Sequence, residues 1–155
     1  GLTSLQVSDD RRTLVAGAAE GRALVLDEPL SFWGGVNPAT GDIVDPRHPQ
    51  HGANVAGRIL VMPSGRGSSS SSSVLAEAIR AGTAPAAIVL READPILALG
   101  AIVARELFGT TIPVVVSAQV ALRTDDLATV RADETGVELL NAIQDVFLDD
   151  AVTIA

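Results

Sequence analysis

The fold is decided by the stretch Gly57-Arg-Ile-Leu-Val-Met-Pro-Ser-Gly-Arg-Gly-Ser68, which five more serines and Val74-Leu-Ala-Glu-Ala-Ile-Arg80 follow. Apolar residues within 55–62 predict a buried central strand, and the glycines after it predict a turn. Apolar residues at 74, 75, 78 and 79 form one stripe of a helix, which we expect from about Ser72 to Ala81. We expect Ser72 or Ser73 to be the N-cap of this helix.

The serine-rich loop between this strand and helix has the chemistry of an anion-binding site. The first N–H groups of a helix lack intrahelical partners and carry the positive end of its dipole. Gly65 and Gly67 let the backbone approach a ligand, and Arg66 adds a guanidinium suited to a carboxylate or phosphate. The hydroxyls of Ser68 to Ser73 add a candidate nucleophile or base. A flexible serine linker is the alternative, but apolar periodic segments begin close by on both sides and favour an ordered loop.

Two further strands and one helix extend this pattern toward the C-terminus. The runs 85–90 and 112–116 have the composition of buried strands. Between them, Asp94 and Pro95 suit an N-cap and a first helical position, and the helix runs to about Leu107. It is apolar nearly all round, so we expect it to be buried, in part against a partner. The alternation of strands and helices predicts a parallel sheet with crossover helices.

Both ends of the chain are richer in strand patterns than the middle. We expect short strands at 13–17 and 22–26 with a hairpin-like connection, a short polar helical stretch at 123–126, and a hairpin of 127–132 with 136–140. The predicted fold class is therefore α/β, in a single domain that spans 12–140. Residues 1–11 predict a flexible N-terminus, and 141–155 a C-terminal extension of the same domain.

The composition excludes several classes of function. The chain has 155 residues, which suggests one domain, and a net charge of −8 at pH 7, which argues against nucleic acid as a partner. It has no lysine for a Schiff base and no cysteine for a thiol nucleophile or thiolate ligation. Two histidines are too few for a metal site of its own, so we expect no metal on this chain. No apolar stretch is long enough to cross a membrane and no signal-peptide pattern is present, so we expect a cytoplasmic location.

Two loops before the central strand hold further candidate residues. Trp33 precedes the pair Gly34-Gly35, and we interpret it as a core or lid residue. The glycine pair and the following 37–41 predict consecutive turns that can bring N–H groups to a ligand. A proline-pinned polar loop then carries His48 and His51, which by chemistry alone are more typical of surface histidines than of acid–base groups.

Three segments together resemble the swivel domain, or small subunit, of the aconitase X family. They are Leu30-Ser-Phe-Trp-Gly-Gly-Val-Asn-Pro-Ala-Thr-Gly-Asp-Ile43 with Asp45 and His48-Pro, then 57–68, then Ala86-Ala-Ile-Val-Leu90 with Ala93-Asp-Pro-Ile96 and Gly100-Ala-Ile-Val-Ala104. The resemblance covers roughly 12–140. It implies a swivelling β/β/α fold that forms half of a hydro-lyase. A larger partner subunit would complete a heterodimer and hold an iron or iron–sulfur centre, which fits the absence of cysteine here.

The resemblance also implies roles for particular residues. In such enzymes the serine of a Gly-x-Gly-Ser turn acts as an alkoxide base beside the substrate carboxylate, and Ser68 matches that position. Arg66, Gly67 and Ser69 would bind substrate or polarise the base. The other candidates for lining the pocket are Gly34, Gly35, Asn37, Thr40 and His48. Asn37 departs from the aspartate expected in the family pattern, a change that a turn tolerates.

Two hydroxy-acid substrates are usual in this family. One group dehydrates cis-3-hydroxy-L-proline and the other mevalonate 5-phosphate. An Ala/Arg/Asp-rich, lysine-free composition favours the first, as does the lack of an evident second basic group near Arg66 for a phosphate. A non-catalytic binding module for a carboxylated or phosphorylated ligand is the alternative of another class. A phosphohistidine carrier is the third alternative. Such a carrier would need a histidine in the serine loop, and this loop has none.

Overall fold

A computed structural model describes residues 11–141 of the chain. The expected flexible N-terminus, apart from Arg11, and the expected C-terminal extension, apart from Asn141, lie outside the described residues.

Seven strands form one sheet in the order β1-β5-β4-β3-β2-β6-β7. The strands are β1 (Arg12–Val15), β2 (Gly17–Val25), β3 (Ile59–Met62), β4 (Ala87–Leu90), β5 (Val114–Val116), β6 (Leu127–Asp133) and β7 (Gly136–Asn141). The four strands β2, β3, β4 and β5 are parallel to their neighbours within this set, as the alternating pattern predicts. The strands β1, β6 and β7 extend both sides of this parallel unit with antiparallel pairs.

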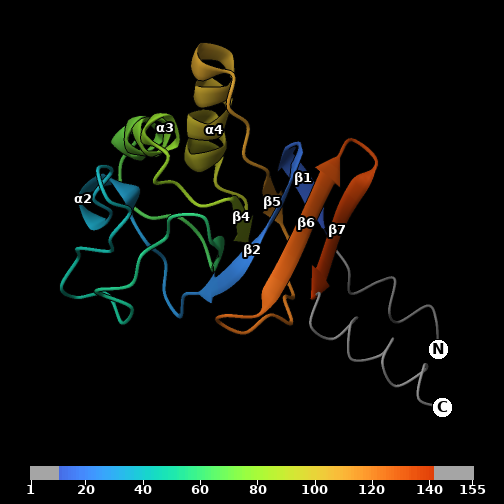
Figure 1. The fold of residues 1–155 in the computed structure, drawn as a ribbon, viewed down its shortest axis with the longest axis horizontal. Helices are drawn as coiled ribbons and strands as arrows, with labels where there is room; N and C mark the ends of the chain where they lie inside the picture. The colour runs from blue at the N-terminus through green and yellow to red at the C-terminus, as the bar shows by residue number, and fades with distance from the viewer. Residues whose placement is uncertain (1–10, 142–155) are drawn as a thin grey trace.

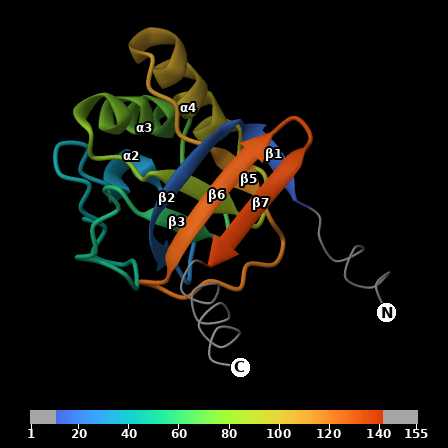
Figure 2. The ribbon, with the colours of Figure 1, turned by 45° about the vertical axis from the view of Figure 1, so that its right-hand side comes forward.

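Within residues 11–141, three helical segments accompany the sheet: α2 (Phe32–Gly35), α3 (Ser70–Ala81) and α4 (Pro95–Phe108). The helices α3 and α4 pack beside each other on one face of the sheet (Figures 1 and 2). The expected N-cap of α4 is confirmed, because Asp94 accepts hydrogen bonds from the N–H groups of Ile96 and Leu97. The short α2 is a pair of turns rather than a regular helix, since Trp33 and Gly34 have non-helical dihedral angles.

The helix α3 begins earlier than the sequence predicts. Its N-cap is Ser69, so the prediction of Ser72 or Ser73 was wrong. The Ser68 hydroxyl and carbonyl oxygens accept the N–H groups of Ser70 and Ser71, and these bonds start the helical turn inside the serine run. Serine side chains that bond to nearby backbone N–H groups favour such a start.

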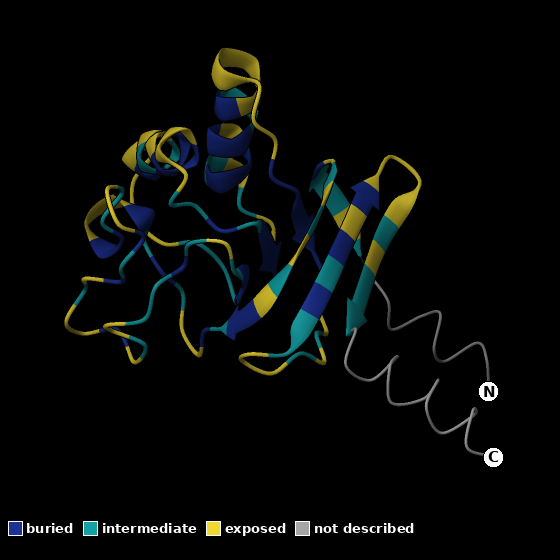
Figure 3. Ribbon diagram, viewed as in Figure 1, coloured by how far each residue is buried: buried dark blue, intermediate teal, exposed yellow. Residues whose placement is uncertain are grey.

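The sheet separates two apolar cores. Figure 3 shows buried residues on the strands and on α3 and α4. In β3 the residues alternate: Leu60 and Met62 pack under the helices, while Ile59 and Val61 pack on the opposite face, beneath β6. The sheet curls so that β1 approaches β6 and β7, and the Thr13 hydroxyl of β1 donates to the Asp133 carbonyl of β6 at 2.7 Å. Burial on both faces explains why the parallel strands read as continuous apolar runs.

Three further local predictions were wrong, two near the ends of the domain and one at the central strand. No hairpin joins β1 to β2: β1 pairs with β5, while 17–22 pairs with β6, so β2 is one long strand. The segment 123–126 is a turn, in which the Asp126 carboxylate accepts the Arg123 N–H at 2.8 Å. The central strand begins at Ile59 rather than near residue 55, because turns occupy the preceding residues.

Candidate functional site

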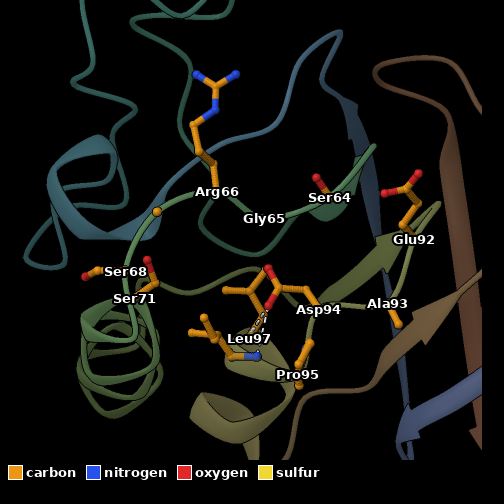
Figure 4. A pocket seen from close by; sticks show the side chains of 12 residues that line it. Ser64, Gly65, Arg66, Ser68, Ser71, Glu92, Ala93, Asp94, Pro95 and Leu97 are labelled. Carbon is orange, nitrogen blue, oxygen red and sulfur yellow. Dashed lines mark hydrogen bonds between the residues drawn. The ribbon is translucent and has the colours of Figure 1, made fainter.

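The serine loop borders a cavity of about 330 Å³ between the N-terminal ends of α3 and α4. One wall comes from 64–68 and Ser71, and the other comes from 92–97 (Figure 4). These segments follow β3 and β4, so the cavity lies at the carboxyl ends of two neighbouring parallel strands. Ligands in α/β folds commonly bind at this position.

Both glycines of the loop are required by close contacts within the chain. Gly67 has φ +100°, and a Cβ there would lie 2.5 Å from the Ser31 hydroxyl oxygen. A side chain at Gly65 would overlap the carboxylate of Asp94, which caps α4. The loop is therefore wedged between the segment before α2 and the start of α4, and it is ordered rather than a linker.

Ser68 presents an exposed hydroxyl at the start of α3. Its Oγ accepts the Ser70 N–H at 3.1 Å and lines the cavity. A backbone donor and the positive end of a helix dipole both stabilise negative charge on this oxygen. Arg66 lines the same cavity, and within residues 11–141 its guanidinium has no hydrogen-bond or ion-pair partner. Its side chain points away from α4 (Figure 4).

Ser71 is a site residue that the sequence analysis did not single out. It is buried, and its Oγ accepts the Trp33 N–H at 3.2 Å and lies 3.5 Å from the Ser31 Oγ. The Ser31 hydroxyl in turn donates to the Trp33 carbonyl at 2.8 Å. Ser71 lies four residues before the buried Leu75, so the helical spacing of the apolar stripe was the available signal.

The glycine pair lies beside the serine loop because of these bonds. Gly35 is buried against Leu30 and Asp45, while Gly34 is exposed with φ +79°. Trp33 is 58% exposed, so its ring is not part of the core. Ser69 is also exposed; it makes no side-chain cap bond and does not line the cavity.

His48 is buried rather than a surface residue. Its Nδ1 accepts the Gln50 N–H at 3.0 Å, which places the proton of a neutral ring on Nε2, 3.2 Å from the carbonyl oxygen of Glu28. Both ring nitrogens are therefore occupied by the chain's own backbone. His51, the other candidate, is exposed.

His48 helps to line a second cavity of about 350 Å³, which shares Arg66 with the first. Its other lining residues are Glu28, Asp45, Pro46 and Arg47. The expectation that no second basic group lies near Arg66 was wrong, because the fold brings Arg47 to the same cavity. Arg47 and Arg66 come from different loops of the sequence and line one cavity in the fold.

Asn37 and Thr40 lie at the other end of α3, away from the serine loop. The Pro38 carbonyl between them accepts the Thr83 hydroxyl at 2.6 Å, just beyond the C-cap of α3. Because α3 has 12 residues, this end is roughly 18 Å from Ser70 at about 1.5 Å per residue. Their side chains serve the local turn: Asn37 accepts the Ala39 N–H.

The same turn holds the Asp42 carboxylate. Hydrogen bonds with Asn54 and then with Thr40 lower the pKa of Asp42 below its ordinary value. Among the described residues, no group of three or more His, Cys, Asp or Glu side chains is arranged to hold a metal ion. None of the helices in this part of the chain is long and apolar enough to cross a membrane.

A parallel sheet flanked by antiparallel strands, with a glycine–serine loop at the start of a helix, defines a small α/β domain with an open cavity beside that loop. The sequence profile of the aconitase X swivel domain matches residues 9–139. The chain therefore belongs to the aconitase X swivel domain family, as its motifs predict.

Relatives and a solved structure agree with this assignment. A cis-3-hydroxy-L-proline dehydratase of Pseudomonas aeruginosa is 55% identical over 117 residues, which are 76% of this chain and 20% of that protein. A phosphomevalonate dehydratase small subunit of Methanothermobacter thermautotrophicus is 46% identical over 95 residues, which are 61% of this chain and 72% of that subunit. The structure of Thermococcus kodakaraensis aconitase X (holo-form) superposes with a TM-score of 0.75 at 39% identity, over 85% of this chain and 97% of that one.

Proposed function

We propose that this chain is the small-subunit part of an aconitase X-type dehydratase and that Ser68 is its base. The observation that carries the proposal is the environment of the Ser68 Oγ, which accepts an N–H group at the start of α3 in a cavity shared with Arg66. As an alkoxide, this oxygen would take the proton from the carbon that bears the substrate carboxylate. The hydroxyl on the neighbouring carbon would leave, a C=C bond would form, and one water would be lost in all.

The remaining groups of the cavity would bind and orient the substrate. Arg66 has a free guanidinium fork for the carboxylate, and Gly67 leaves space beside the base. We also assign Ser69, Gly34 and Gly35 to substrate binding, from positions outside the lining of this cavity. The partner would supply the iron or iron–sulfur centre, because this chain has no cysteine. Asn37 and Thr40 would act only in their turn, since the fold keeps them away from Ser68.

We favour cis-3-hydroxy-L-proline as the substrate. The relative that is 55% identical is named as a dehydratase of this compound, and the matched residues make up a fifth of that protein. The second cavity supports the same choice, because two carboxylates, Glu28 and Asp45, line it together with Arg47 and Arg66. A mixed set of charges suits a zwitterionic amino acid, whereas two carboxylates would repel a phosphate. Mevalonate 5-phosphate is the second candidate, favoured by the pair of arginines and by the small-subunit relative.

The experiment is a dehydration assay with this chain, alone and combined with the larger subunit, on both substrates. We expect turnover of cis-3-hydroxy-L-proline by the combined enzyme only. Ser68→Ala should lower kcat by about 10²- to 10⁴-fold, the usual contribution of a general base. Ser73→Ala is the matched control, since Ser73 is exposed in the same serine run and does not line the cavity.

Three results would contradict parts of this proposal. Full activity of Ser68→Ala would remove Ser68 as the base. If the combined enzyme dehydrated only mevalonate 5-phosphate, that compound rather than cis-3-hydroxy-L-proline would be the substrate. Ligand binding by this chain without turnover in any combination would favour the binding module.

A further inference from the structure

The N-terminal half of α4 leaves an apolar groove open beside β1. Six residues line this groove, which has a volume of about 410 Å³: Leu14, Ala93, Pro95, Ala98, Leu99 and Ile102. All six are apolar, and Leu99 is 50% exposed. The sequence predicted burial nearly all round α4, but the fold buries only its inner face, which carries Leu97, Ala101 and Ala104.

The groove is continuous with the serine-loop cavity. Ala93 and Pro95 line both of them. A protein partner that covers the cavity from the α4 side would therefore also contact the groove. This contact is a consequence of the shared rim and does not depend on which substrate is bound.

The apolar stripe on this face of α4 is confined to the end of the helix that borders the cavity. Positions 95, 98, 99 and 102 form one stripe at helical spacing. One turn further along the same face, Arg105 and Glu106 form an exposed ion pair with 3.2 Å between their charged atoms. The stripe therefore ends after two turns, which is typical of a bounded contact surface rather than of a helix that is apolar throughout.

We propose that this groove binds the larger part of the dehydratase, through apolar side chains on that partner's surface next to the active site. The inference rests on the proposed function, and two findings support this occupant. The matched region makes up only 20% of the Pseudomonas relative, so most of that protein is a further body beside the swivel domain. Other relatives are named as small subunits, which implies a larger subunit. An apolar contact at the rim would also exclude water from Ser68 when the two parts close.

The test compares two leucines of α4 in the assembled enzyme. Leu99 lines the groove, whereas Leu107 is 69% exposed near the C-terminal end of α4 and lies outside it. We expect Leu99→Asp to raise the dissociation constant for the larger subunit at least tenfold, because a carboxylate would be buried among apolar groups. Leu107→Asp should change it less than twofold. Titration calorimetry measures both, and thermal unfolding of each variant alone confirms that the exposed substitutions leave the domain folded.

The outcomes separate this inference from the proposed function. If Leu99→Asp binds the larger subunit as tightly as the wild type, the groove is not the interface, while turnover by the complex would still support the function. Equal weakening by both aspartates would also overturn the groove as the specific surface. If the wild-type chain binds no larger subunit, both proposals fail. Self-association that Leu99→Asp abolishes would assign the groove to a second copy of this chain.

Discussion

The helices α3 and α4 both begin at the same cavity, but their N-termini are capped in different ways. At α4, Asp94 has an extended backbone and its carboxylate accepts two N–H groups, with Pro95 in the first helical position. At α3, the N-cap Ser69 is itself in helical conformation and makes no side-chain bond. The Ser68 oxygen accepts one N–H group there, and the Ser71 side chain turns away to hold Trp33.

The difference separates a structural helix terminus from one that is available to a ligand. A carboxylate cap satisfies the orphan N–H groups and places negative charge at the positive end of the dipole, which leaves nothing for an anion. Hydroxyl groups satisfy the backbone without adding charge. The serine run therefore leaves the start of α3 open to an anion, while the carboxylate-capped start of α4 forms the opposite wall of the cavity.

The largest effect on stability is expected at Ser71, the hydroxyl by which α3 holds the turn before it. Ser71→Ala would leave the Trp33 N–H without its acceptor, which typically costs about 1–3 kcal/mol for a buried donor. Because Trp33 is the one tryptophan of the chain, its fluorescence should shift and become easier to quench as the turn loosens. Ser72→Ala is the control, since the Ser72 hydroxyl bonds only to the Ser69 carbonyl. Equal fluorescence in both variants would show that Ser71 does not hold the turn.

A smaller loss is expected at the cap of α4. Asp94→Ala should lower the free energy of unfolding by about 1 kcal/mol, the typical contribution of an N-cap side chain. Asp94→Asn keeps a side-chain oxygen acceptor and should recover most of the loss. Urea unfolding measures both variants, and an unchanged midpoint for Asp94→Ala would mean that the cap does not stabilise α4.

The smallest effect is expected at Ser69, the corresponding position of α3. Ser69→Ala should change the free energy of unfolding by less than about 0.5 kcal/mol, as for an exposed side chain outside any network. Ser69→Asp would instead copy the cap of α4 and add negative charge beside Ser68, so we expect a higher KM for an anionic substrate. If Ser69→Ala destabilised the domain as much as Asp94→Ala, the contrast between the two helix termini would disappear.

Local chemistry made several features predictable. The three runs that became β3, β4 and β5 consist of apolar residues without polar alternation, and this pattern requires burial on both faces. Asp94 and Pro95 favour a helix start through contacts within one helical turn, so the start of α4 could be predicted locally. The Gly-Arg-Gly-Ser loop was expected at the carboxyl end of the central strand, and the structure has it there beside a cavity.

The features that the sequence did not determine all depend on contacts between distant segments. A one-residue gap separates β1 from β2, yet the two strands do not pair with each other. The residues of β1 pair with β5 residues 99 to 104 positions away, and those of β2 pair with β6 residues 105 to 115 positions away. The turn that holds the glycine pair is bonded to α3 through Trp33 and Ser71, but the turn that follows it, at Asn37 and Thr40, lies at the far end of α3. Nothing in the local pattern distinguishes these two halves of the same motif.

The sequence by itself determined the parallel centre, the two main helices and the chemistry of the serine loop, because these follow from residue types within one turn or strand. The tertiary structure alone decided which serine faces inward, that Arg47 joins Arg66 at one cavity, and that the groove of α4 stays open. The physical reason is that burial and cavity walls are properties of the packed chain. Burial and cavity walls depend on the free energies of strand pairing and side-chain packing between segments far apart in the sequence. The residues of one segment alone do not determine these free energies.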